Sequence, residues 1–92
     1  MLQVNATPSL ASELAARLGA DAVLTDADVL ASHARDHAPT VPAGRAAALV
    51  RARTESDVVE TLRFAHARGV PVVPRAAGTG LSGGANAIDG CI

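Results

Sequence analysis

The sequence predicts a small α+β fold, with an arm of helices over residues 1–42 and a strand–helix–strand unit within residues 43–92. Leucines recur at helical spacing near the N-terminus, at Leu10, Leu14 and Leu18. Farther along, two short apolar runs flank a longer stretch with helical periodicity. Hydrophobic residues make up 49% of the chain, a composition typical of a folded domain rather than a disordered tail.

The N-terminal arm is expected to hold two helices. Thr7 can cap the first helix and Gly19 can end it. A second, shorter helix should begin near Thr25 or Asp26, because both side chains can accept hydrogen bonds from the free N–H groups of a helix start. Prolines and glycine interrupt residues 33–45, so this segment is predicted to be a loop.

Three consecutive patterns predict the strand–helix–strand unit. Residues 46–51 form an apolar run typical of a buried strand. Thr54 followed by Asp57 indicates a helix start, and Gly69 indicates its end. Residues 70–74 are rich in valine and predict a second strand with proline at its margins. On the helix between the strands, these apolar side chains recur at helical spacing: Val58, Val59, Leu62, Phe64 and Ala65.

A glycine-rich segment follows the second predicted strand directly. Glycine occupies four of the seven positions from Gly78 to Gly84, with Thr79 and Ser82 among them. Such a backbone can approach a ligand closely, and its successive N–H groups can form a concave anion site. Ligands collect at strand ends in α/β proteins. A diphosphate is the expected ligand because it presents several acceptor oxygens, and Arg75 could add a charge-assisted hydrogen bond to it.

Two common nucleotide motifs resemble parts of this segment. Gly78, Gly80 and Gly83 have the spacing of the dinucleotide fingerprint, but turn-rich residues 84–90 follow where that fingerprint requires a helix. The phosphate loop of nucleoside triphosphatases requires Lys and then Ser or Thr after its last glycine, and this chain has neither. A stand-alone nucleotide- or phosphate-binding module and a fragment of a nicotinamide oxidoreductase are the alternatives to the interpretation that follows.

Residues 72–85, VVPRAAGTGLSGGA, resemble the flavin-binding segment of the FAD-linked oxidases of the vanillyl-alcohol-oxidase type. The branch that they resemble most holds a glycolate oxidase subunit and the flavin-dependent D-lactate dehydrogenases. Residues 49–59, LVRARTESDVV, resemble the strand and helix start that precede this segment in the family. The resemblance implies a PCMH-type FAD-binding domain that holds the FAD diphosphate through these residues: Pro74, Arg75, Ala76, Ala77, Gly78, Thr79, Gly80, Ser82, Gly83 and Gly84.

Two positions distinguish this chain within the family that it resembles. Some relatives attach the flavin covalently through a histidine in this loop, and Thr79 is the residue that aligns with it. The resemblance therefore implies non-covalent FAD. The family most often has glycine directly after the arginine, whereas this chain has Ala76. A methyl group would cost about 1 kcal/mol if this residue needed positive φ, and it would cost nothing in an ordinary region of φ; we expect FAD binding to be weakened but to survive.

The resemblance also implies a longer protein. Asp89 and Gly90 predict a turn, and Cys91 and Ile92 begin what should be a third strand. Members of the family continue into the rest of the flavin domain and a cap domain that binds substrate. The reaction implied is oxidation of a small 2-hydroxy acid of the glycolate or D-lactate type, with electrons passed on to another acceptor or a partner subunit. We expect these 92 residues alone to be inactive and to contain no catalytic residue.

Composition argues against several other classes of protein. The net charge is −1, from 8 basic and 9 acidic residues, which gives no basic surface for nucleic acid or for an anionic membrane. Cys91 is the only cysteine, so neither an internal disulfide nor a cysteine metal cluster is expected. His37 and His66 are expected to be ordinary surface or helix residues. No signal peptide and no apolar run of transmembrane length is apparent, so we expect a cytoplasmic protein.

Overall fold

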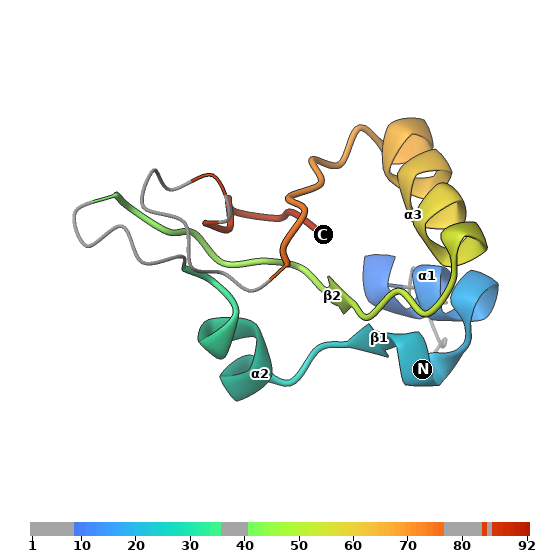
Figure 1. The fold of residues 1–92 in the computed structure, drawn as a ribbon, viewed down its shortest axis with the longest axis horizontal. Coiled ribbons are helices and arrows are strands. Elements are labelled where there is room, and N and C mark those ends of the chain that lie inside the picture. The colour runs from blue at the N-terminus through green and yellow to red at the C-terminus, as the bar shows by residue number, and fades with distance from the viewer. Residues whose placement is uncertain (1–8, 36–40, 77–83, 85) are drawn as a thin grey trace, which may run out of the picture.

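The computed structural model describes residues 9–35, 41–76, 84 and 86–92. Within these residues, three α-helices, a 3₁₀ turn (η1) and two short strands follow one another (Figure 1). α1 and α3 pack together at one end of the molecule, and α2 lies apart from them (Figure 1). The bounds of the elements are Leu10–Leu18 for α1, Ala20–Ala22 for η1, Val23–Leu24 for β1, Ala27–Ser32 for α2, Leu49–Val50 for β2 and Glu55–Arg68 for α3.

The first helix begins later than the sequence predicted. Ser9 is its N-cap, and the Ser9 hydroxyl accepts a hydrogen bond from the N–H of Ser12 at 3.1 Å. The prediction that Thr7 caps this helix was wrong, and Thr7 itself lies outside the described residues. Gly19 ends the helix as predicted, because its N–H donates to the carbonyl of Ala15 at 2.8 Å.

The ends of α2 and α3 confirm the capping signals in the sequence. The Asp26 carboxylate accepts hydrogen bonds from the N–H groups two and three residues later, at 2.9 and 3.2 Å. The Thr54 hydroxyl accepts from the N–H of Asp57 at 3.1 Å. The Asp57 carboxylate accepts in turn from the backbone N–H and the guanidinium of Arg53, and these bonds hold the pKa of Asp57 below its usual value. Gly69 ends α3 in the left-handed conformation.

One hydrophobic core joins the predicted arm to the remainder of the chain. At its centre, Phe64 is only 2% exposed. The guanidinium groups of Arg17 and Arg68 lie over the Phe64 ring, 5.5 and 5.0 Å from its centroid. Arg68 also forms an ion pair with Glu13, and this pair links α3 to α1. The hydrogen bond from Arg68 lowers the pKa of the Glu13 carboxyl group. The buried residues of this core come from α1, η1, α3 and the C-terminus: Leu14, Leu18, Ala22, Phe64, Ala65 and Ile92.

The apolar stripe predicted on α3 is only partly buried. Phe64 and Ala65 face the core, whereas Val58, Val59 and Leu62 are 45%, 38% and 50% exposed. α1 packs against the side of α3 that carries Phe64, and the adjacent side of the same helix is turned away from it. The helical spacing of these five residues is confirmed, and only two of them are buried in the core.

The strand–helix–strand unit is less regular than predicted. β2 covers only two residues of the predicted strand 46–51, and its partner is β1, which runs antiparallel to it. Residues 70–74 form no regular strand. Pro71 and Pro74 explain this difference, because neither has a backbone N–H to donate to a neighbouring strand. Since β1 comes from the predicted arm and β2 from the rest, both parts share one small sheet, and a domain boundary at residue 42 stays a prediction.

The C-terminal residues lie between the two segments that were predicted to be strands (Figure 1). The Ile92 N–H donates to the carbonyl of Pro71 at 3.0 Å, and the Ile92 carbonyl accepts from the N–H of Val73 at 2.9 Å. On the other side, the Cys91 carbonyl accepts from the N–H of Ala47 at 2.8 Å. In a parallel pair, one residue bonds through its N–H and its carbonyl to two residues of the neighbouring segment that are two positions apart. The segments are therefore aligned as parallel neighbours without forming a regular sheet.

Replacing Phe64 by alanine should destabilise the protein by about 3–5 kcal/mol, because the change removes a large, fully buried side chain from the α1–α3 interface. Leu62→Ala is the matched control on the same helix, and it should cost less than about 1 kcal/mol because Leu62 is half exposed. Denaturant unfolding of both variants measures the difference. Equal losses of stability would contradict a core centred on Phe64.

Candidate functional site

The glycine-rich segment leaves and rejoins the described fold beside α2. The structure describes its first residues, Pro74, Arg75 and Ala76, and its last predicted site residue, Gly84. Pro74, Ala76 and Gly84 are exposed, and Arg75 is half-buried. The site can therefore be built from the two ends of the segment. The other predicted cofactor-binding residues lie outside the described residues: Ala77, Gly78, Thr79, Gly80, Ser82 and Gly83.

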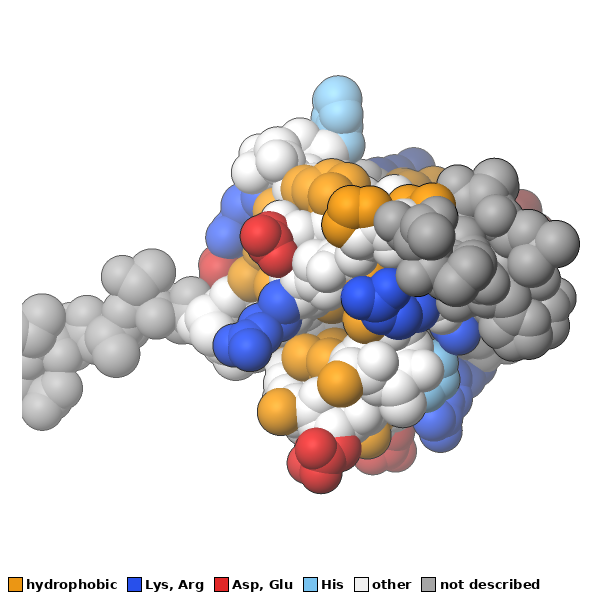
Figure 2. Space-filling model, turned by 90° about the vertical axis from the view of Figure 1, so that its left-hand side faces the viewer, with side chains coloured by type: hydrophobic (Ala, Val, Ile, Leu, Met, Phe, Trp, Pro, Cys, Tyr) orange, Lys and Arg blue, Asp and Glu red, His pale blue; other side chains and the backbone are white. Residues whose placement is uncertain are grey.

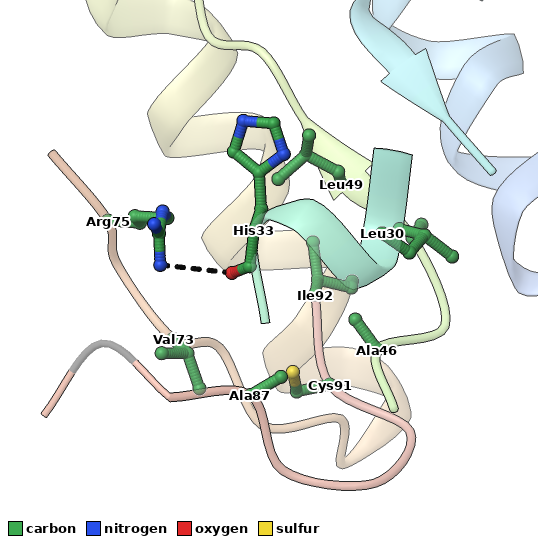
Figure 3. A pocket seen from close by; sticks show the side chains of 10 residues that line it. Leu30, His33, Ala46, Leu49, Val73, Arg75, Ala87, Cys91 and Ile92 are labelled. Atoms are coloured by element: carbon green, nitrogen blue, oxygen red, sulfur yellow. Dashed lines mark hydrogen bonds between the residues drawn. The ribbon is translucent and has the colours of Figure 1, made fainter. Parts of the chain in front are cut away.

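At the first end, the Arg75 side chain extends toward the C-terminal end of α2. Its Nη1 donates to the carbonyl oxygens of His33 at 3.1 Å and Arg35 at 2.6 Å. Figure 3 shows the guanidinium facing the His33 carbonyl, while the imidazole points away from it. The sequence predicted a contact between this guanidinium and a diphosphate, and the structure places it on backbone carbonyls. The Arg75 backbone stays a predicted cofactor contact.

At the second end, Asn86 is buried, with 7% of its surface exposed. Its side-chain amide donates to the carbonyl oxygens of Val41 and Pro42, both at 3.1 Å. The N–H of the next residue, Ala87, donates to the carbonyl of Ala34 at 2.7 Å. Sequence reasoning missed Asn86, because an asparagine after glycines indicates a turn and no local pattern identifies a partner 45 residues earlier.

Gly44 allows the chain to pass close to the turn that follows this second end. The Gly44 N–H donates to the carbonyl of Ala87 at 2.6 Å. A Cβ atom on Gly44 would lie 2.6 Å from both the backbone nitrogen and Oδ1 of Asp89, which is too close for any L side chain. The Asp89 carboxylate accepts from the N–H of Arg45 at 2.8 Å. Close backbone packing therefore fixes the chain that leaves the glycine-rich segment.

Two cavities border α2 next to these contacts. The smaller, of about 30 Å³, is mostly apolar (Figure 3). The larger, of about 500 Å³, lies between α2 and residues 43–46 and has a size usual for a small-ligand site. Arg75 lines the smaller cavity, Arg35 and Arg45 line the larger, and none of the described residues that line either cavity is acidic. This set of groups suits an anion such as the diphosphate of a nucleotide cofactor.

Ala76 lacks the backbone strain that would weaken cofactor binding. Among the described residues, positive φ occurs only at the glycines Gly19, Gly69 and Gly90. Alanine is tolerated at negative φ without a steric cost. The prediction that Ala76 weakens FAD binding through a strained backbone was therefore wrong.

The chain beyond the glycine-rich segment does not continue as a helix. Residues 84 and 86–92 contain turns and irregular chain but no helical residue. The dinucleotide fingerprint of nicotinamide enzymes requires a helix to open on the loop. The described residues therefore reject the nicotinamide alternative.

Other features of the described residues place limits on the chemistry of the site. They include no group of three or more His, Cys, Asp or Glu side chains that could hold a metal ion. No helix among them has the length and apolar character needed to cross a membrane. Cys91 is a buried free thiol and His66 is exposed, whereas His37 lies outside the described residues. Arginine and acidic side chains are scattered among hydrophobic ones on the face shown in Figure 2.

The two described ends of the glycine-rich segment thus lie beside α2, near Arg35 and Arg45. Comparison with protein families matches residues 46–92 to a family described as an FAD binding domain. The chain belongs to this family. FAD is therefore its cofactor, and the chain forms an FAD-binding part of a flavin-dependent oxidoreductase. Comparison with curated proteins found no match.

Replacing Ala76 by glycine should leave the affinity for FAD unchanged, because the substitution relieves no backbone strain. The glycine should lower the stability of the cofactor-free protein by up to about 1 kcal/mol, because it gives the unfolded chain more freedom. A flavin titration and a denaturant melt of the variant measure the two effects. Tighter FAD binding by Ala76→Gly would show that the alanine is strained.

Replacing Gly44 by alanine should lower stability by about 1–3 kcal/mol and weaken FAD binding, because the new methyl group would push against the backbone of residues 88–89. Gly69→Ala is the matched control. Gly69 has φ +64 with open space around it, so alanine there should cost about 1 kcal/mol without changing FAD affinity. Thermal melts and FAD titrations compare the two variants. If both lowered FAD affinity equally, close packing at Gly44 would not be what supports the site.

Proposed function

We propose that this chain anchors the diphosphate of a non-covalently bound FAD in an enzyme that oxidises a 2-hydroxy acid of the glycolate or D-lactate type. The observation that carries the proposal is the family match over residues 46–92, which contains the whole glycine-rich segment and both of its described ends. Arg35 and Arg45 line the larger cavity and add positive charge, and no acidic residue is among the described residues that line it.

In this proposal, the cofactor is bound mainly by backbone groups. The alanine, glycine, serine and threonine residues between Arg75 and Gly84 are small, which leaves room for the N–H groups to approach phosphate oxygens. Thr79 stands where covalent relatives have a histidine, and a threonine side chain does not form the bond to the flavin that histidine forms. The chain therefore binds FAD through many weak, reversible contacts rather than through a covalent link.

The substrate class follows from the resemblance of residues 72–85 to glycolate oxidase and the flavin-dependent D-lactate dehydrogenases. The bound flavin supplies the acceptor for the hydride that leaves the α-carbon of the 2-hydroxy acid. The residues of this chain bind and orient the cofactor, and we assign none of them to proton transfer. Substrate-positioning groups and the next electron acceptor are proposed to come from a cap domain or a partner subunit.

Titration of the purified protein with FAD, FMN, riboflavin and ADP tests the anchoring role. FAD should bind much more tightly than riboflavin, because riboflavin lacks the diphosphate. Acid precipitation of the complex should release all of the flavin into solution, as a non-covalent cofactor requires. Equal affinity for FAD and riboflavin would contradict diphosphate anchoring. Binding of ADP as tight as that of FAD would favour the alternative of a general nucleotide-binding module.

Anaerobic addition of substrate tests the reaction. Glycolate or D-lactate should bleach the oxidised flavin when the FAD-loaded chain is joined to its substrate-binding domain, and the FAD-loaded chain alone should stay oxidised. L-Lactate serves as the stereochemical control. Bleaching by an alcohol that lacks the carboxylate, with no response to either 2-hydroxy acid, would contradict the proposed substrate class and leave FAD anchoring intact.

A further inference from the structure

The two ends of the glycine-rich segment are held by residues 33–35 and 41–42, the described residues of the stretch 33–42. Arg75, at the first end, donates to carbonyls of His33 and Arg35. Asn86, at the second end, donates to two carbonyls at the other end of that stretch. We infer that Arg75 and Asn86 are positioning residues of the FAD site, which fix the two ends of the diphosphate-binding segment against residues 33–42. This inference rests on the proposed function and names how the segment is held.

The Arg75 contacts satisfy carbonyl groups of the first residues after α2. α2 ends at Ser32, so the carbonyls of His33 and Arg35 cannot accept from a next helical turn. A guanidinium beside a helix C-terminus is favoured both by hydrogen bonding and by the helix dipole. Both bonds come from Nη1, which has two hydrogens to donate. This nitrogen is therefore committed to the protein backbone rather than to a phosphate.

The Asn86 contacts use the side-chain amide in a similar way. Nδ2 donates to the carbonyls of Val41 and Pro42, and the side chain is almost fully buried. A buried amide that loses its acceptors is costly, so this contact strongly favours one position of the chain. The backbone bond from Ala87 to Ala34 holds the same end from its other side. The second end is therefore fixed as firmly as the first.

Fixed ends matter because a binding loop must be ordered when its ligand binds. A segment whose two ends are already held at a set separation loses less conformational entropy on binding than one with free ends. The positioning residues therefore affect FAD affinity without touching FAD. Their effects should also depend on each other, since releasing either end frees the same segment.

The test compares Arg75→Met, Arg75→Lys and Asn86→Asp with the native protein, with Arg51→Met as the control for loss of one exposed arginine. Arg75→Met and Asn86→Asp should each weaken FAD binding on the order of tenfold, since each loses hydrogen bonds to carbonyls. The double variant should bind little more weakly than either single variant. Arg75→Lys should recover most of the affinity, because an ammonium group can donate to the same carbonyls.

The salt dependence of FAD binding separates positioning from direct contact with the phosphates. If Arg75 acts through residues 33–42, the change in FAD affinity between about 0.05 and 0.5 M NaCl should be the same in Arg75→Met as in the native protein. A clearly smaller salt dependence in Arg75→Met would show a direct phosphate contact and overturn the inference. Unchanged FAD affinity in both single variants, or strictly additive losses in the double variant, would also overturn it.

Further controls distinguish a variant that fails to fold from a failure of the proposed function or of the inference. Far-UV circular dichroism and thermal melts identify any variant that fails to fold, and Arg75→Lys, the mildest change, then decides through its salt dependence and affinity. If the native protein itself did not bind FAD, the proposed function would fail, and the inference would fall with it. If the native protein bound FAD but the variants behaved like Arg51→Met, only the inference would fail.

Discussion

The contact between α1 and α3 depends on Phe64, the only aromatic residue in the chain. Its ring is buried against α1, and the guanidinium groups of Arg17 and Arg68 cover it. The other buried side chains of this core are leucine, isoleucine and alanine, each of which buries less area. This ring therefore contributes the largest apolar side chain to the contact that holds the N-terminal arm, together with the Arg68–Glu13 pair and the β1–β2 pairing.

The arm is also connected to the glycine-rich segment through the small sheet and α2. From α1 the chain passes through η1 to β1, which pairs with β2 through Val23 opposite Val50 and Leu24 opposite Leu49. α2 follows directly, and residues 33–42 then reach both ends of the glycine-rich segment. The family match begins only at residue 46, yet the structure ties that region to residues before it. The arm therefore contacts both described ends of the glycine-rich segment.

Local signals in the sequence predicted the helices well. Asp26, Thr54 and Gly69 act within one turn of the helix ends that they define, so their roles can be read from neighbouring residues. The glycine-rich segment was also evident, because its composition alone permits close approach to a ligand. The family of the chain and its cofactor could be predicted from the same segment, and the family match supports both.

Features set by distant residues could not be predicted. The Arg75 guanidinium could have faced a phosphate or a carbonyl, and only the fold brings the end of α2 to it. Asn86 is buried through partners 44 and 45 residues earlier. The exposed side of α3 at Val58 and Leu62 depends on which side α1 covers. Pro71 could have indicated that the second strand would be irregular, since proline cannot complete a ladder.

The side-chain hydrogen bonds from Arg75 and Asn86 to residues 33–42 span 40 to 45 positions along the chain. Contacts so distant in sequence require large loops to close, which slows their formation during folding. A cofactor that binds only after they form stabilises the folded chain increasingly as its free concentration rises. A larger supply of flavin therefore lets more of the protein survive proteolysis, because FAD binding lowers the population of the open forms that proteases cleave.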